Sequence, residues 1–168
     1  MKTLYLLRHA KASWKDAELE DQDRPLKKKG RDQADTLSDH LSSLLPPPGG
    51  IWCSPSTRTR QTLDYFLEVW PLPQSRLHFD EDLYLASGAV WFQKLTAFPN
   101  DMDIAMLVGH NPGITDLLHS LDQTATEAVS HLRTCEFVQI DFTVDSWKQV
   151  KSGCGALKLC IRAKDLLS

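Results

Sequence analysis

The sequence has no long hydrophobic run and no strong excess of charge of either sign. Its apolar segments are too short to span a bilayer, and the first of them meets Arg8 too early for a secretory signal. With a net charge of −3 and a pI near 6.0, the chain also lacks the basic surplus typical of non-specific nucleic-acid binding. We therefore expect a cytoplasmic protein with no membrane or nucleic-acid partner.

Cysteine is sparse, and its spacing excludes two common uses. The four cysteines contain no Cys-x-x-Cys pair, which argues against a zinc knuckle and against a redox dithiol. Cys53 precedes Arg58, but they are one residue too close for the phosphate-binding loop of a cysteine phosphatase. The thiols are therefore expected to be isolated and buried.

The composition that is present is typical of one globular domain. Of 168 residues, 42% are apolar and 24% are charged, which argues against disorder. A chain of about this length buries roughly 70% of its unfolded surface around one core. No repeat or linker divides the sequence, so we expect a single domain over residues 1–168.

Short apolar segments alternate with segments of helical periodicity. Strands are expected at residues 3–7, 51–53, 77–79 and 104–108, and helices at residues 28–45 and 88–98. Two more helices are expected to begin at Ser54-Pro55 and Asn111-Pro112, where a capping residue precedes proline. Residues 136–144 and 156–161 alternate like an antiparallel pair joined near residues 152–153.

This order predicts an α/β fold with three layers. Helices flank a mostly parallel central sheet, and the antiparallel strand pair lies near the C-terminus. Residues 11–29 are polar and charged, which predicts a long loop after the first strand. Long loops inside compact domains are often functional.

Three charged motifs each follow an apolar run. They are Leu-Leu-Arg-His at residues 6–9, Ser-Pro-Ser-Thr-Arg at residues 54–58 and Val-Gly-His-Asn-Pro at residues 108–112. Because ligands of α/β sheets bind at the carboxyl ends of the strands, these motifs are expected to share one crevice. They would bring together two arginines and two histidines, a cationic pocket that suits a phosphoryl group.

Histidine in such a pocket indicates catalysis in addition to binding. Neighbouring arginines disfavour another positive charge and lower the pKa of an imidazole, which keeps it neutral and nucleophilic. One of the two histidines could then attack phosphorus and form a covalent phosphohistidine. The other histidine and the arginines would stabilise the transition state, and water would complete the cycle without a metal or any other cofactor.

The run at residues 6–14, Leu-Leu-Arg-His-Ala-Lys-Ala-Ser-Trp, resembles the Arg-His-Gly signature of the histidine phosphatase superfamily, also called phosphoglycerate mutase-like. Further motifs occur in the order of that family: Asp23-Arg24-Pro25-Leu26 with Gly30, Ser54-Pro55-Ser56-Thr57-Arg58 with Gln61-Thr62, Leu83-Tyr84, and Gly109-His110. The resemblance extends from Lys2 to about Leu121. It is closest to the short SixA-type phosphohistidine phosphatase branch.

The resemblance implies a role for each residue of the pocket. His9 is the phosphorylated nucleophile, and Arg8, Arg58 and His110 complete the phosphate pocket. The proton donor is harder to place, and Asp82 is our choice among the acids that precede the Leu-Tyr pair.

Three more positions after the nucleophile carry expectations. Ala10 stands where many members of the family have glycine, which matters only if that residue needs a positive φ. Lys11 and Ser13 lie in the long loop, where they are expected to contact the phosphate or a protein substrate.

The chain lacks a large insertion between Arg58 and His110, which leaves an open site. An open site suits a phosphorylated protein surface, and an imidazole leaving group tolerates weak acid assistance. We therefore predict a metal-independent phosphatase that hydrolyses phosphohistidine or phosphomonoester substrates. Its partner would be a phosphorylated protein or a small phosphorylated metabolite.

The main alternative is a non-catalytic phosphate- or phosphoprotein-binding module on the same fold. A metallohydrolase is disfavoured because His9 and His110 lack a third ligand, and the arginines would repel a cation. A mutase would need a closed site that protects its intermediate from water. Oligomeric state is not indicated, since Trp91-Phe92 fits either a core or an interface.

Overall fold

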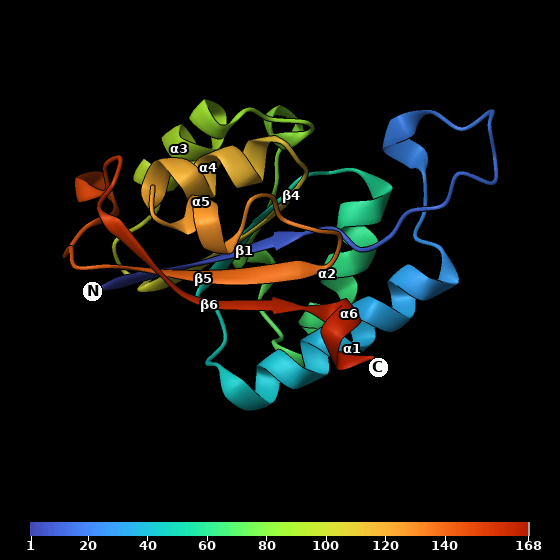
Figure 1. The fold of residues 1–168 in the computed structure, drawn as a ribbon, viewed down its shortest axis with the longest axis horizontal. Helices are drawn as coiled ribbons and strands as arrows, with labels where there is room; N and C mark the ends of the chain where they lie inside the picture. The colour runs from blue at the N-terminus through green and yellow to red at the C-terminus, as the bar shows by residue number, and fades with distance from the viewer. Residues whose placement is uncertain (168) are drawn as a thin grey trace.

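Six strands form one mixed sheet (Figure 1). The computed structural model describes residues 1–167 and orders the strands β3-β2-β4-β1-β5-β6. The strands are β1 (Lys2–Arg8), β2 (Gly50–Cys53), β3 (Leu77–Phe79), β4 (Ile104–Gly109), β5 (Glu136–Phe142) and β6 (Gly155–Arg162). The first four are parallel, whereas β5 is antiparallel to β1 and β6 is antiparallel to β5. The predicted α/β class, with its C-terminal antiparallel pair, is confirmed.

Helices cover both faces of this sheet (Figure 1). One face packs against α1 (Lys28–Leu44), α2 (Thr57–Val69) and α6 (Ala163–Leu166). The other face packs against α3 (Gly88–Thr96), α4 (Gly113–Leu121) and α5 (Ala125–Ala128). Short 3-10 helices occur at η1 (Asp21–Asp23), η2 (Gln74–Arg76), η3 (Glu81–Leu83) and η4 (Trp147–Gln149). No helix among residues 1–167 has the length and apolarity needed to cross a membrane.

The alternation of side chains along β1 supplies both cores. Leu4 and Leu6 pack with the α3 and α4 side, whereas Tyr5 and Leu7 pack with the α1 and α2 side. All four are at most 1% exposed, as expected for a strand covered on both faces. Trp91, a residue of α3, is fully buried, so this tryptophan belongs to the core and not to an exposed interface.

The predicted cap at Ser54 is wrong. Helix α2 begins at Thr57, and its N-cap is Ser56, whose Oγ accepts a hydrogen bond from the backbone N of Thr59 at 3.4 Å. The backbone N of Ser54 instead donates to the carbonyl of Val108 at 3.1 Å, which extends the pairing of β2 with β4. The hydrogen bonding between these strands therefore continues one residue past the end of β2, and the Ser54 hydroxyl is free for another contact.

The predicted cap at Asn111 is also wrong. Helix α4 begins at Gly113, and the Asn111–Pro112 peptide bond is cis. The amide of Asn111 donates to the Leu132 carbonyl at 2.6 Å and its Oδ1 accepts from the Thr115 hydroxyl at 2.6 Å. This side chain therefore ties the turn before α4 to the segment before β5.

The long loop is anchored at its base. Ala12 and Leu26 form an antiparallel bridge, and the backbone N of Ser13 donates to the Pro25 carbonyl at 2.7 Å. The backbone N of Leu26 also donates to Oε1 of Gln61, on α2, at 2.7 Å. The two ends of the loop are therefore held together where the loop leaves and rejoins the rest of the protein, as the blue segment in Figure 1 shows.

Gly30 allows the base of this loop to lie directly against α1. A Cβ at Gly30 would come within 2.2 Å of the Lys11 carbonyl oxygen, which itself accepts from the backbone N of Lys27 at 3.0 Å. Backbone atoms cannot give way as a flexible side chain can. Glycine is therefore required here by close approach, although it lies inside a helix.

We expect the change Gly30→Ala to lower the free energy of unfolding by about 2 kcal/mol, because the steric conflict outweighs the roughly 1 kcal/mol gain in helix propensity. Urea denaturation of the variant and of Ser43→Ala, an exposed position of α1, measures the difference. A Gly30→Ala protein as stable as the wild type would contradict the close approach.

Candidate active site

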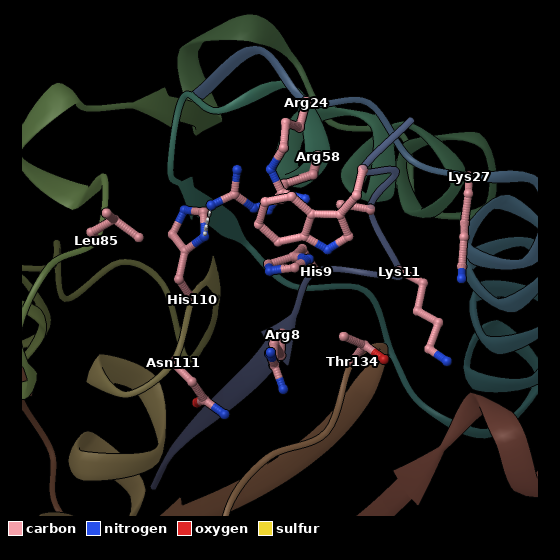
Figure 2. A pocket seen from close by; sticks show the side chains of 12 residues that line it. Arg8, His9, Lys11, Arg24, Lys27, Arg58, Leu85, His110, Asn111 and Thr134 are labelled. Atoms are coloured by element: carbon pink, nitrogen blue, oxygen red, sulfur yellow. Dashed lines mark hydrogen bonds between the residues drawn. The ribbon is translucent and has the colours of Figure 1, made fainter. Parts of the chain in front are cut away.

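A cavity of about 370 Å³ opens beyond the end of β1 (Figure 2). Its walls come from the strand ends, the long loop and the segment before β5. The lining residues are Arg8, His9, Lys11, Ala12, Trp14, Arg24, Lys27, Arg58, Leu85, His110, Asn111 and Thr134. Five of these carry a positive side chain and none is a carboxylic acid, so the cavity suits an anion.

His9 is held with one ring nitrogen bonded and the other free. Its backbone N donates to the Gly109 carbonyl at 3.3 Å, and its ring Nδ1 lies 2.7 Å from the carbonyl oxygen of Ala10. Because a carbonyl oxygen only accepts, Nδ1 carries the hydrogen and Nε2 keeps its lone pair. The side chain is 8% exposed, so this lone pair lies in a largely desolvated place.

Ala10 follows His9 without backbone strain. Its backbone N donates to the Thr62 hydroxyl at 2.9 Å, and that hydroxyl donates to the Arg58 carbonyl at 2.7 Å. Ala10 is not among the residues with positive φ, so the glycine common at this position in the family is not required here.

His110 is fixed by contacts at both ring nitrogens. Nε2 lies 2.7 Å from Oγ of Ser54, and Nδ1 lies 3.3 Å from a terminal nitrogen of Arg58. Since a guanidinium only donates, Nδ1 accepts and Nε2 carries the hydrogen that Ser54 receives. The ring centroids of His9 and His110 are 5.4 Å apart, so the two imidazoles face the same small space.

Two arginines keep an unused donor in the site. Nη1 of Arg8 donates to the Leu132 carbonyl at 3.0 Å, and Arg58, which is 3% exposed, donates to Asp21. Nε of each arginine is buried and has no hydrogen-bond partner among residues 1–167. Buried donors are nearly always satisfied, so these two favour a ligand that accepts hydrogen bonds.

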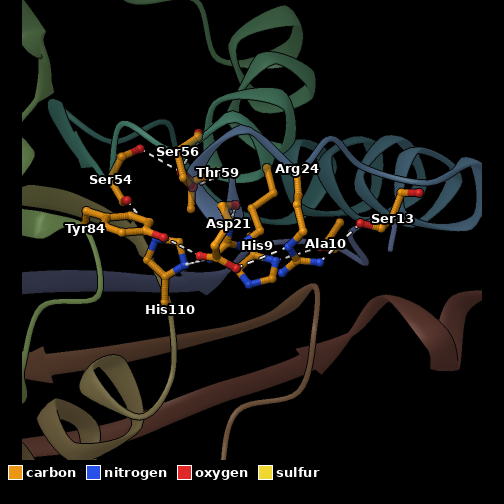
Figure 3. A network of polar contacts seen from close by, with 11 residues as sticks. His9, Ala10, Ser13, Asp21, Arg24, Ser54, Ser56, Thr59, Tyr84 and His110 are labelled. Atoms are coloured by element: carbon orange, nitrogen blue, oxygen red, sulfur yellow. Dashed lines mark hydrogen bonds and ion pairs between the residues drawn. The ribbon is translucent and has the colours of Figure 1, made fainter. Parts of the chain in front are cut away.

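Asp21, which the sequence analysis did not identify, lies on the long loop and pairs with Arg58 and Arg24 (Figure 3). Its Oδ2 lies 3.0 Å from Nη2 of Arg58, and its Oδ1 accepts from Nε of Arg24 at 3.2 Å. The hydroxyl of Tyr84 donates a short hydrogen bond to the same carboxylate. The pair with Arg24 is local (i,i+3), but no local spacing signals the contacts with Arg58 and Tyr84, because they join the loop to segments far along the chain.

Comparisons with known proteins agree with this geometry. The model of the histidine phosphatase superfamily (branch 1) matches residues 4–84. An uncharacterized chloroplastic protein of Arabidopsis thaliana is 33% identical over 166 residues, covering 93% of this chain and 74% of the relative. The chain belongs to the histidine phosphatase superfamily.

Two solved structures share the fold. A protein of Agrobacterium tumefaciens assigned as the phosphohistidine phosphatase SixA superimposes with a TM-score of 0.82 at 24% identity, covering 95% of this chain and 97% of that one. The protein histidine phosphatase SixA complexed with tungstate gives a TM-score of 0.81 at 20% identity, covering 98% and 99%. The expected SixA-like, phosphoglycerate mutase-like fold is confirmed.

The other predicted residues of this member of the superfamily fall in different places. Lys11 lines the cavity, whereas Ser13 lines a neighbouring one, and its carbonyl accepts from Nη1 of Arg24 at 3.2 Å. Trp14, to which the sequence analysis assigned no role, is 77% exposed and lines the cavity. The Arg24 guanidinium covers its ring at 3.4 Å from the centroid.

Asp82, predicted as the proton donor, does not line the cavity. It is exposed on η3, and its backbone N donates to Oδ1 of Asp80 at 2.9 Å. The reason is the tight turn of η3, which buries Leu83 completely and sends Asp82 toward solvent. From the same segment, Leu85 lines the cavity and Tyr84 reaches Asp21.

The ionisable groups of the site have displaced pKa values. Burial, reinforced by His110 and the arginines, lowers the pKa of His9 to about 3. Burial and then Arg58 lower the pKa of His110 to about 4. The Tyr84 hydrogen bond, followed by the contacts with Arg58 and Arg24, lowers the pKa of Asp21 to about 2. For both histidines, burial therefore lowers the pKa more than the neighbouring arginines do.

We expect both histidines to stay neutral in the free protein from pH 8 down to about pH 5. Because their folded pKa values lie below the usual histidine value of about 6.5, the unfolded chain binds more protons, and their contribution to stability falls as pH decreases through that value. NMR of the ring nitrogens measures this directly. An imidazolium at either residue at pH 6 would contradict the buried, arginine-flanked geometry.

Proposed function

We propose that this protein is a phosphatase that transfers a phosphoryl group to Nε2 of His9 and then to water. The observation that carries the proposal is the pinned tautomer of His9. Its Nδ1–H is committed to the Ala10 carbonyl, so the lone pair of Nε2 is available at neutral pH. A neutral, desolvated imidazole beside guanidinium groups is suited to attack phosphorus.

In the first half of the reaction, Nε2 of His9 forms a bond to phosphorus as the bond from phosphorus to the leaving group breaks. The electron pair of that bond stays on the leaving group, which takes up a proton. Arg8 and Arg58 would bind the oxygens of the phosphoryl group, where charge spreads in the transition state. Their unpartnered Nε atoms supply donors for this purpose.

In the second half, a water oxygen forms a bond to phosphorus as the phosphorus–nitrogen bond breaks. The electron pair returns to Nε2 of His9, and the water loses a proton to solvent or to the product phosphate. His110 would support both halves, because Ser54 and Arg58 hold its ring over the same space as His9. The enzyme ends in its starting state.

The lack of a proton-donating acid among the described lining residues favours phosphohistidine as the substrate. None of the described lining residues is a carboxylic acid, and Asp21 is ionised, with a pKa of about 2. An alkoxide leaving group would need a strong proton donor, whereas an imidazole nitrogen is itself basic near neutral pH. The substrate that fits is therefore a phosphohistidine protein, ahead of a small phosphorylated metabolite.

A metal-independent reaction follows from the charge of the lining. Five basic side chains face the cavity and would repel a divalent cation. These same side chains can provide the charge stabilisation that a metal supplies in other phosphatases.

The first test removes the nucleophile. With His9→Ala, we expect turnover of a phosphohistidine protein to fall on the order of 10⁴-fold or more, because no other group forms the covalent intermediate. Acid-labile phosphate trapped on the enzyme should vanish with it. His40→Ala, an exposed histidine on α1, is the matched control, and a chelator should leave wild-type turnover unchanged.

The same assay separates the alternatives. An aryl phosphate turned over faster than the phosphohistidine protein would overturn the assigned substrate class. Phosphate binding by a wild type that turns over neither compound would instead identify a non-catalytic phosphate-binding module. Undiminished turnover by His9→Ala would remove His9 from the mechanism.

The second test concerns Asp21, whose carboxylate competes with phosphate for Arg58. We expect Asp21→Asn to bind inorganic phosphate several-fold more tightly, roughly 3- to 10-fold, because one negative charge leaves the site. Isothermal titration at fixed ionic strength measures the change. Asp23→Asn, an exposed acid on the same 3-10 helix, is the control. Weaker binding by Asp21→Asn would mean that Asp21 positions Arg58 instead of blocking it.

A further inference from the structure

A second, smaller cavity lies beside the catalytic one. It has a volume of about 170 Å³ and is lined by Lys11, Lys29, Gln33, Arg133, Thr134, Arg162 and Lys164. Lys11 and Thr134 also line the catalytic cavity, so the two spaces share a wall. Figure 2 shows Lys11 and Thr134 from the side of the catalytic cavity.

The fold fixes this cavity relative to the nucleophile. Cys135, whose φ is +53°, turns the chain so that its backbone N lies 3.2 Å from the Arg8 carbonyl and 3.0 Å from the His9 carbonyl. The carbonyl of Cys135 accepts from the backbone N of Ala163, the first residue of α6, at 3.1 Å. The second cavity therefore cannot move independently of the strand end that carries His9.

Positive charge in this second cavity is poorly compensated. Of its five basic residues, only Arg162 forms an ion pair within residues 1–167, with Asp165 at 3.1 Å. The nearby Glu136 is buried, and its carboxylate accepts from the backbone N of Arg133 and the thiol of Cys160. Repulsion from Lys29 and then Lys27 lowers the pKa of Lys11. These ammonium groups would be stabilised by an anion between them.

A buried amide points to a ligand independently of the charge. Gln33 is 3% exposed on α1, lines the second cavity, and has a buried Oε1 without a hydrogen-bond partner among residues 1–167. Buried amides are usually satisfied, and the side-chain Nε2 of Gln33 also has no hydrogen-bond partner among residues 1–167, yet it is not one of the buried unpartnered atoms. This amide nitrogen is therefore available to donate to an anion that the lysines hold.

We propose that this second cavity is a subsite for a second anionic group on the same substrate, a phosphate or a carboxylate next to the phosphoryl group that is transferred. Because the two cavities share Lys11 and Thr134, one molecule can occupy both. A phosphorylated peptide with an acidic neighbour or a small bisphosphate would present the required pair of charges. The kinetic consequence rests on the proposed phosphatase function, whereas anion binding in the subsite does not.

The binding test uses inorganic phosphate and NMR of the Gln33 side-chain amide. In the wild type, this signal should shift with added phosphate, and the double variant Lys29→Gln/Lys164→Gln should weaken that response on the order of 10-fold. Signals of His9 and His110 should respond to phosphate in both proteins. Lys148→Gln/Lys151→Gln, which removes the same charge at exposed positions that line neither cavity, is the control.

A Gln33 signal that does not respond to phosphate would overturn the subsite, whether or not the enzyme turns over any substrate. Equal weakening by the control pair would also overturn it, because the effect would then come from net charge alone. Failure of the phosphatase proposal would be recognised separately, by a responding Gln33 in a protein without turnover.

The kinetic test compares substrates that differ by one charge. For a phosphohistidine peptide with acidic neighbours, Lys29→Gln/Lys164→Gln should reduce kcat/KM on the order of 10-fold, while turnover of the same peptide with neutral neighbours stays within about 2-fold. A short diol bisphosphate and its monophosphate repeat the comparison for a small molecule. If kcat/KM falls only for the acidic peptide, or only for the bisphosphate, that substrate class supplies the second anion. An equal fall in kcat/KM for the substrates with and without the second charge would contradict the subsite.

Discussion

Concentrated positive charge at one edge of the sheet is the constraint on which the site depends. The parallel order of β1, β2 and β4 brings Arg8, Arg58 and two histidines to the same edge, close to one another. Such a cluster is stable only if part of it is neutral or compensated. The structure uses both solutions, because both histidines are buried as neutral rings and Asp21 reaches Arg58 from the long loop.

The compensation has a chemical consequence. A neutral His9 with its Nδ1–H bonded to a carbonyl presents a lone pair, whereas an imidazolium could not attack phosphorus. The carboxylate of Asp21 offsets Arg58 in the absence of an anion but does not fill the free Nε donors. The charge of the site is thus compensated in the folded protein, and its arginines still have donors for hydrogen bonds to a phosphoryl group.

Local sequence pattern predicted much of the fold, and the two wrong predictions of helix caps have a common cause. The strands at residues 104–108 and 51–53 were predicted nearly to their ends, because runs of buried apolar side chains leave little alternative. The predicted caps failed at Ser54 and Asn111, because each side chain has a better partner far along the chain, His110 for one and the Leu132 carbonyl for the other. Asp82 lies outside the cavity because the burial of Leu83 decides where the turn of η3 points.

The sequence by itself determined the α/β class, the strand ends next to which Arg8, His9 and His110 lie, and the family to which the chain belongs, because short-range periodicity and motif order encode these features. The tertiary structure alone decided the tautomers of the two histidines, the approach of Asp21 to Arg58 and the cationic cavity around Gln33. The tautomer of His9 follows from its contact with the adjacent residue Ala10, whereas each of the other features depends on contacts between residues tens of positions apart. Distances of that kind are set by how helices and loops pack on the sheet, and no local spacing records them.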